Sequence, residues 1–364
     1  MIEEELKAFG LSVGMDLVGI ASADAFVRES LFMQERPVHP FEHPDTAERI
    51  EPQLVLPGVR SIIAGGISYL SEAPESGERL TGWFSRYCRG RDYHLVLEER
   101  LNQVGQWLQA RCPQARVMTF VDTGPPLERA IAERAGLGRM GKNTNVIAPR
   151  LGSWIFLGEI LTDVALRPDA PMSGSICGSC TLCLDVCPTQ CLTPWRLDAF
   201  RCLGYVNQEG GSVPHEYREV MGPRLFGCDD CQDVCPHNVS ARAGLHPEFT
   251  PRDGVTLVEL LTMSEREFDT RIGPTAAAWR GLLTLQRNAV VALGNSGDEA
   301  ACPALLATLK REEPLLRSHA AWALGRLARL RPALSSEIRQ SLAQHEDADP
   351  EVKGEIAMAL ASLS

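Results

Sequence analysis

The sequence predicts three consecutive folds: an α/β domain, a ferredoxin-like module that holds two iron–sulfur clusters, and a stack of helical repeats. Three observations predict them. Strand-like and helix-like segments alternate over residues 1–166, two cysteine runs lie within 167–247, and an Ala/Leu-rich pattern recurs within 248–364. Because each pattern is typical of one fold, we take these three ranges as the predicted domains.

The first range alternates short apolar runs with amphipathic segments. SIIAGGISYL (61–70) contains a continuous apolar run with an internal pair of glycines, which suits a strand that is buried on both faces. In 92–110 the apolar residues recur at helical spacing, at Leu97, Leu101, Val104 and Leu108. We therefore expect strands at 17–22, 61–70 and 117–121, one or two strands within 153–166, and helices at 2–9, 92–110 and 127–136.

The last range repeats itself. RNAVVALG (287–294), SHAAWALG (318–325) and GEIAMALA (354–361) share one ending, and they recur after 31 and 36 residues. Each is preceded by a second helical segment. Repeated helix pairs stack into a solenoid of the HEAT type, so we expect such repeats here.

The first cysteine run has the spacing of a bacterial two-cluster ferredoxin. Cys177, Cys180 and Cys183 are separated by two residues each, and Cys187 follows after three and precedes a proline. In such a run three thiolates hold one cubane, and the fourth cysteine reaches the other. Zinc is the alternative, but it prefers two separated pairs of ligands, so the spacing favours clusters.

The second run, Cys228, Cys231 and Cys235, lacks the first cysteine of the motif, because Leu225 stands at its place. The missing ligand is then Cys191 or Cys202. Cys191 follows Cys187 by only four residues, and we do not expect a chain that leaves one cluster to fold back onto the other so soon, so we choose Cys202. The ligand sets become Cys177, Cys180, Cys183 and Cys235 for cluster one, and Cys187, Cys202, Cys228 and Cys231 for cluster two.

Asp122 lies at the carboxyl end of a predicted strand, where α/β sheets bind their ligands. The alternative is a plain capping residue for the turn or helix that follows. The glycine-rich stretch 136–143 comes shortly after and allows a ligand to approach the backbone closely. It matches neither the P-loop nor the dinucleotide-binding pattern.

Six stretches taken together resemble the epoxyqueuosine reductase family, and the resemblance runs essentially from end to end. It implies a cobalamin-binding α/β domain related to reductive dehalogenases, two [4Fe–4S] clusters and tRNA-binding HEAT-like repeats. The implied reaction reduces epoxyqueuosine to queuosine in the anticodon loop of tRNA. The stretches are SRYCRGRDYH, VDTGPPLERAIAERAGLGRMGKNT, CGSCTLCLDVCPT, RCLGY, FGCDDCQDVCPHN and WRGLLTLQRNA.

The resemblance also implies roles for single residues. Asp122 would donate a proton above the cobalt. Some members of the family carry a cysteine where this chain has Ser85, and Cys88 is three residues displaced, so we do not substitute it. The residues implied at the cobalamin are Arg49, Ser85, Asp122, Val146 and Leu157.

Charge is unevenly distributed along the chain. The net charge is −11, but residues 280–331 hold eight Lys/Arg and four Asp/Glu, a local charge of +4. We expect basic side chains of the repeats to contact tRNA phosphates, although for any one of them a solvated helix face is the simpler alternative. The candidates are Arg280, Arg287, Arg317 and Arg326.

The N-terminal segment is acidic, and no apolar run reaches the length of a membrane span. We therefore expect a cytoplasmic protein without a membrane partner. We also expect it to be a monomer that takes electrons from an external donor. Two other classes stay open. A plain electron-transfer protein would bind no corrin, and a small-molecule cobalamin reductase of the dehalogenase type would have no affinity for tRNA.

Overall fold

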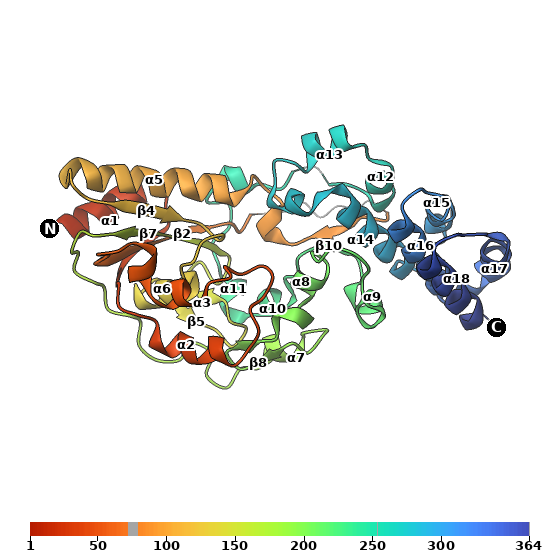
Figure 1. The fold of residues 1–364 in the computed structure, drawn as a ribbon, viewed down its shortest axis with the longest axis horizontal. Helices are drawn as coiled ribbons and strands as arrows, with labels where there is room; N and C mark the ends of the chain where they lie inside the picture. The colour runs from red at the N-terminus through yellow and green to blue at the C-terminus, as the bar shows by residue number, and fades with distance from the viewer. Residues whose placement is uncertain (72–78, 253, 364) are drawn as a thin grey trace. The chain divides into compact units, whose positions relative to one another are not determined.

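The computed structural model describes residues 1–71, 79–252 and 254–363 (Figure 1). The chain forms two compact units, and the cysteine region contributes to both. Unit 1 comprises Met1–Glu72, Gly90–Ala199 and Asp230–Thr250, and unit 2 comprises Ala73–Arg89, Phe200–Asp229 and Pro251–Ser364. The boundaries at 166 and 247 stay a prediction.

Unit 1 is built on a four-stranded sheet in the order β1 (Leu17–Ser22), β2 (Ser61–Ser68), β7 (Ile155–Thr162) and β4 (Val117–Phe120). These are the four predicted strands. All eight residues of β2 are buried, as its uninterrupted apolar run requires. Every neighbouring pair is antiparallel. The alternation of strands and helices identified the elements but not the direction in which the strands pair.

Helices cover both faces of this sheet (Figure 1). The helices α1 (Ile2–Ser12) and α5 (Tyr93–Arg111) pack on one face, and α6 (Glu128–Arg134) packs on the other. The predicted apolar stripe of α5 is completely buried. Gly158 in β7 lets this stripe approach, because a Cβ there would lie 2.7 Å from a methyl carbon of Leu101.

The remaining helices and strands of unit 1 are short. None of the helices in the described ranges is long and apolar enough to cross a membrane. The short elements are α2 (Val27–Gln34), α3 (Thr46–Ile50), α4 (Pro52–Val55), β5 (Arg139–Met140), β6 (Val146–Ile147), α7 (Leu182–Asp185), β8 (Leu192–Thr193), β9 (Arg196–Leu197), α10 (Asp230–Asp233) and α11 (Pro236–Val239).

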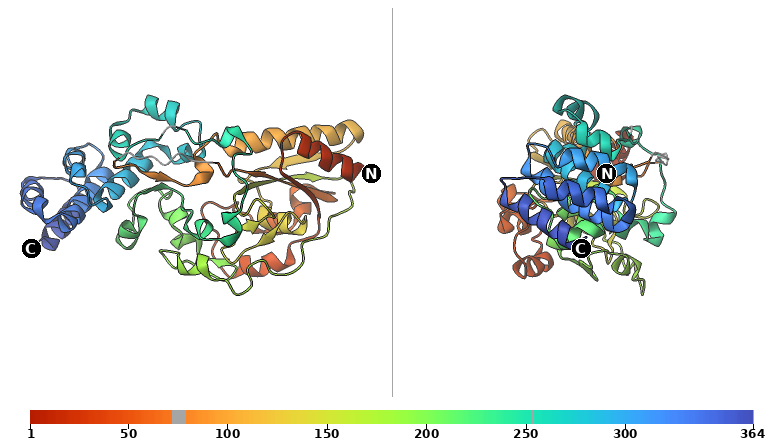
Figure 2. Two further views of the ribbon diagram at one scale, coloured as in Figure 1. Left: turned by 180° about the vertical axis from the view of Figure 1, so that it is seen from behind. Right: turned by 90° about the vertical axis from the view of Figure 1, so that its right-hand side faces the viewer.

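Unit 2 combines a small parallel strand pair with a stack of helices. β3 (Trp83–Phe84) pairs with β10 (Arg224–Phe226). The three repeated octets lie in α14, α16 and α18, which pack one against the next (Figures 1 and 2). This confirms the predicted helical repeats. The helices are α8 (Leu203–Val206), α9 (His215–Met221), α12 (Leu257–Thr262), α13 (Glu265–Arg271), α14 (Gly281–Asn295), α15 (Cys302–Thr308), α16 (Pro314–Leu330), α17 (Ser335–Gln344) and α18 (Pro350–Ser362).

Two of the three octets end in glycine, and the next helix of the stack explains why. A Cβ on Gly294 would lie 2.8 Å from the Cα of Ala323 in the next helix. A Cβ on Gly325 would lie 2.9 Å from the Cβ of Ala359 in the helix after that. Both distances are too short for real side chains, so these glycines permit the close approach of successive helices.

A larger side chain at this contact should separate α16 from α18. We expect Gly325→Val to lower the free energy of unfolding by about 1–3 kcal/mol, the usual effect of overpacking a core. The matched control is Gly354→Ala in α18, where an added Cβ meets nothing within 4 Å. Urea unfolding followed by circular dichroism compares the two proteins, and equal stability would contradict the account of the repeat.

Candidate iron–sulfur and acid–base sites

The four cysteines predicted for cluster one line a single small cavity in unit 1. Cys177 and Cys180 reach it from the segment that leads into α7, Cys183 from α7 itself, and Cys235 from the residue before α11. A cubane needs one thiolate for each of its four irons. The donor set around this cavity therefore fits a [4Fe–4S] cluster with ligands from both cysteine runs.

The electrostatics of these thiols agree with their convergence. The pKa of Cys183 lies above its ordinary value, first because the thiol is partly buried and then because Cys177, Cys235 and Cys180 surround it. Thiolates crowded in this way repel one another unless a cation lies between them. Bound iron would supply that cation.

The cysteines predicted for cluster two are divided between the units, with Cys187 and Cys231 in unit 1 and Cys202 and Cys228 in unit 2. Within unit 1, the sulfur of Cys187 lies 3.4 Å from that of Cys191. The contact keeps Cys191 beside a predicted ligand of this cluster. The choice of Cys202 over Cys191 stays a prediction.

Within unit 2, the segments of Cys202 and Cys228 are held together. Cys202 immediately precedes α8, and the buried residues of that helix form a core against which Cys228 packs. Asn207, at the end of the helix, exchanges two hydrogen bonds of 2.8 and 3.0 Å with the backbone of Gly227. These contacts support Cys202 and Cys228 as ligands of the same cluster.

Asp122 follows β4 and has a left-handed backbone, with φ at 58°. Its side chain is 55% exposed. The carboxylate lies 3.3 Å from Nε2 of His94, and Nδ1 of the same ring lies 2.7 Å from the carboxylate of Asp92. Asp92 also caps α5 through the backbone N–H of His94. Asp122 is therefore held by an imidazole that is itself fixed at the start of a helix.

This arrangement gives His94 a positive charge at neutral pH. Partial burial opposes the charge, but the hydrogen bonds and charges of Asp122 and Asp92 outweigh it and raise the pKa of His94 to about 9. His94 was not predicted from the sequence. Its signal is its place in SRYCRGRDYH, two residues after a helix-capping aspartate.

Two further carboxyl groups face the same region. Glu128, in the first turn of α6, accepts a hydrogen bond from the backbone N–H of Asp122. Burial and then the charge of Asp122 raise the pKa of Glu128 to about 8. Glu159 on β7 is fully buried, and within the described ranges neither of its carboxyl oxygens has a hydrogen-bond partner. Burial, then the charges of Glu128 and Asp122, raise its pKa well above its ordinary value.

The other residues predicted at the cofactor in unit 1 lie on neighbouring elements. Arg49 in α3 donates to Glu42 at 2.6 Å. Its Nε is buried and has no hydrogen-bond partner among the described residues, so it is available to a ligand that carries acceptors. Val146 lies buried in β6, and Leu157 lies two residues before Glu159 in β7. An orphaned buried donor fits a group with amide and phosphate oxygens, as cobalamin has.

Ser85 lies in unit 2 and is buried. Its hydroxyl donates to the carboxylate of Asp229, which also accepts the backbone N–H of Arg86 at 2.8 Å. The neighbouring Cys88 thiol donates to the carbonyl of Ser85 at 3.1 Å. Burial, then the charge of Asp229, raises the pKa of Cys88 well above its ordinary value. Cys88 is therefore a neutral thiol and not a nucleophile.

Arg287 and Arg317, two of the four arginines predicted to bind tRNA, are held by other residues of unit 2. Arg287 is 1% exposed, and it donates to the backbone carbonyls of Asn207, Glu209 and Gly211. Arg317 forms a bidentate ion pair with Asp347 at 2.7 and 2.9 Å. Phosphate contacts by these two residues stay a prediction, and such contacts would have to replace the bonds just described.

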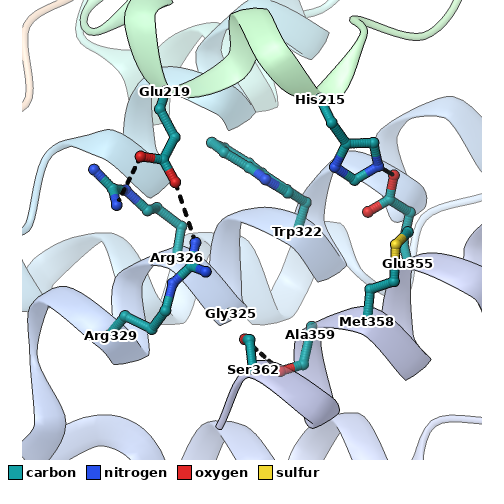
Figure 3. Close-up of a pocket in the computed structure, with 10 residues that line it drawn as sticks. All are labelled: His215, Glu219, Trp322, Gly325, Arg326, Arg329, Glu355, Met358, Ala359 and Ser362. Carbon is teal, nitrogen blue, oxygen red and sulfur yellow. Dashed lines mark hydrogen bonds and ion pairs between the residues drawn. The ribbon is translucent and has the colours of Figure 1, made fainter.

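Arg326 lines a cavity of about 280 Å³ between α9, α16 and α18 (Figure 3). Arg326 and Arg329 both point at Glu219, at 3.0 and 3.3 Å. On the other side of Trp322, His215 lies 2.9 Å from Glu355. The arginines of this cavity are thus balanced by carboxylates.

Arg280 has a different setting. Its guanidinium lies 4.0 Å from the ring centroid of Trp279, which is 56% exposed. An exposed aromatic ring beside a cation is a common surface for binding single-stranded nucleic acid, because bases stack on it. Trp279 was not predicted from the sequence, although it stands in the stretch WRGLLTLQRNA.

These features define the class of the protein: an iron–sulfur oxidoreductase with an acid–base centre in one unit and helical repeats in the other. Family models match along the chain. The epoxyqueuosine reductase QueG model (DUF1730) matches residues 49–123, a 4Fe-4S double cluster binding domain matches 176–238, and HEAT repeats match 284–361.

The chain belongs to the epoxyqueuosine reductase family, which confirms the resemblance seen in its motifs. It is 41% identical to the epoxyqueuosine reductase of Bacillus cereus over 90% of this chain and 89% of that protein. It is 37% identical to the epoxyqueuosine reductase of Bacillus subtilis, over 100% of this chain and 97% of that protein.

Solved structures of the family agree with the fold. A selenomethionine-labelled epoxyqueuosine reductase aligns with a TM-score of 0.92 at 37% identity, over 100% of this chain and 99% of that one. An epoxyqueuosine reductase with an epoxyqueuosine-modified tRNA-Tyr stem loop aligns with a TM-score of 0.91 at 37% identity, over 100% and 98%. The predicted combination of folds is thereby confirmed.

The ligand sets predict eight cysteines and two cubanes. We expect iron near eight per chain after anaerobic reconstitution. Cys202→Ala should lose one cluster, because the predicted set then lacks its fourth thiolate, whereas Cys191→Ala should keep both. Iron and sulfide analysis measures this. If the two variants behave in the opposite way, Cys191 is the missing ligand.

The His94 contacts predict how stability depends on pH. Because the pKa of His94 is about 9 in the folded protein and about 6.5 in the unfolded chain, its stabilisation is complete below pH 6.5 and is lost as the pH rises through 9. At pH 6.5, Asp92→Asn should lower Tm by roughly 2–4 °C, the equivalent of about 1 kcal/mol, with little difference left above pH 9.5.

The control for this series is Asp24→Asn, an exposed aspartate. Thermal unfolding is measured from pH 6.5 to 9.5. A difference between Asp92→Asn and the unsubstituted protein that stays constant with pH would mean that Asp92 acts only as a helix cap.

Proposed function

We propose that this protein reduces epoxyqueuosine in the anticodon loop of tRNA to queuosine, with cobalamin and two [4Fe–4S] clusters. The observation that carries the proposal is the similarity to epoxyqueuosine reductases over the whole chain. The four cysteines around one cavity support the clusters, and the orphaned Nε of Arg49 supports a cofactor near α3.

The reaction defines what the site must supply. Removal of the epoxide oxygen as water leaves an alkene, and it consumes two electrons and two protons. Cobalamin and the clusters, when bound, supply a strongly reducing centre and a path for single electrons, which amino-acid side chains do not offer. Because the chain itself holds no source of electrons, an external donor must provide both.

Asp122 is the proposed acid for the departing oxygen. His94 holds its carboxylate at 3.3 Å, and Asp92 fixes the ring of His94 from the other side. One solved relative is described as having its catalytic aspartate loop swung out of the active site. The exposed position of Asp122 and the left-handed backbone at this residue are consistent with a loop that moves in this way.

Glu128 is a candidate for the second proton. With its pKa near 8, it is mostly protonated at pH 7, and it contacts the backbone of Asp122. Glu159 lies deeper and is neutral for the same electrostatic reasons. A neutral carboxyl beside Asp122 can restore the proton that Asp122 donates.

The proposed RNA contacts lie on unit 2. Trp279 and Arg280 offer stacking and charge at one exposed point, and Arg326 offers a guanidinium that a phosphate could take from Glu219. Such contacts would position the stem loop without reading its sequence. We propose that the protein acts as a monomer in the cytoplasm, where tRNA is modified.

Removal of the proposed acid tests the mechanism. We expect Asp122→Asn to bind cobalamin and the tRNA stem loop normally, and its turnover should fall by roughly two to four decades. The matched control is Asp163→Asn just after β7, which should keep its activity. Turnover is measured on epoxyqueuosine-containing stem loops. If Asp122→Asn fails to fold, Asp122 is a capping residue instead.

Charge reversal tests the RNA surface. In Arg280→Glu, repulsion replaces the attraction between residue 280 and the phosphates near it. We therefore expect stem-loop binding to weaken at least tenfold at low salt and to depend less steeply on salt. Arg339→Glu, on the exposed face of α17, changes the net charge equally and serves as the control. If both variants weaken binding alike, only the net charge matters and Arg280 is no contact.

A further inference from the structure

Lys142 is a buried cation at the cavity of cluster one. It lies between β5 and β6, and it is 7% exposed. Its ammonium Nζ donates to the carbonyls of Gly178 and Cys180, at 2.9 and 2.8 Å. Its backbone N–H donates to the sulfur of Cys177 at 3.3 Å. Both the charge and the amide of this residue are therefore directed at the cysteine segment.

No carboxylate pairs with this ammonium in the parts of the chain that the structure describes, and its two partners are neutral carbonyls. A third neighbour is the ring of Trp195, whose centroid lies 5.8 Å from Nζ. A buried lysine without an anion is rare, because loss of hydration is not compensated. A counter-charge is therefore missing at this position.

The cavity beside Lys142 provides that counter-charge. Four thiolates around a cubane carry more negative charge than the iron and sulfide core neutralises, and Cys177 and Cys180 lie in direct contact with Lys142. The reduced cluster carries one negative charge more than the oxidised one. A fixed cation and an N–H···S hydrogen bond both favour the more negative state, so they raise the reduction potential.

We propose that Lys142 is the electrostatic partner of cluster one and raises its reduction potential above that of the same cluster without the cation. The proposal rests on the ligand set Cys177, Cys180, Cys183 and Cys235, and it does not depend on the RNA substrate. Lys142 is a positioning residue: it sets how readily this cluster accepts an electron, and it takes no part in bond cleavage.

Potentiometric titration of the reconstituted full-length protein, followed by electron paramagnetic resonance, tests this. In Lys142→Gln the midpoint reduction potential of one cluster should fall by at least about 59 mV. This shift corresponds to a tenfold change in the equilibrium constant for one-electron reduction. The other midpoint should not move. Lys353→Gln, an exposed lysine in α18, is the control and should leave both midpoints unchanged.

Each outcome decides the proposal. Iron near eight per chain with unchanged midpoints in Lys142→Gln would overturn it, since Lys142 would then only brace the loop. If Lys142→Gln loses a cluster, Lys142→Arg decides. If the Lys142→Arg protein keeps both clusters and both midpoint potentials, a positive charge is needed at this position, as proposed. If Lys142→Arg also loses the cluster, the proposal is contradicted. Iron near four in the unsubstituted protein would refute the ligand sets, independently of the RNA substrate.

Discussion

The arrangement of the cysteine region depends on one contact: Cys235 lies at the same cavity as Cys177, Cys180 and Cys183. The chain leaves the first run, contributes a long segment to unit 2, and returns at α10 to complete the site. Closure of a long loop costs conformational entropy, which a metal cluster bound at both ends offsets. Cluster binding and the folding of the segment between the runs should therefore be coupled.

A second feature is the different surroundings of three neighbouring carboxyl groups in unit 1. Asp122 is exposed and held by a cationic imidazole, whereas Glu128 and Glu159 are withdrawn from water and favour their neutral forms. Burial thus favours a bound proton on both glutamates. At the predicted cluster one the buried group is instead a cation, because Lys142 is buried beside the ligand cysteines.

The sequence predicted the elements well, because their signals are local. The apolar stripe of α5, the uninterrupted run of β2 and the octets of α14, α16 and α18 each need only a few neighbouring residues to be recognised. The antiparallel pairing of the sheet was not predictable in this way, since it depends on contacts between distant segments. The place of Cys235 at the cavity of the first run was predictable, because the motif itself encodes it.

The site residues show the same division. Asp122 stood out by its position after a strand, but His94, Glu128 and Glu159 acquire their properties from one another across α5, α6 and β7. Arg287 and Arg317 look like any basic residue in the sequence. Only the structure shows that the first is buried against backbone carbonyls and that the second is paired with Asp347.

The shared ligand set is tested most directly by comparing which cluster each cysteine variant loses. Electron paramagnetic resonance of reduced Cys177→Ala, Cys235→Ala and Cys187→Ala proteins identifies the cluster that remains in each. The account predicts that Cys177→Ala and Cys235→Ala lose the same signal, and that Cys187→Ala loses the other. If Cys235→Ala instead loses the signal that Cys187→Ala loses, the two runs do not share cluster one and the account is wrong.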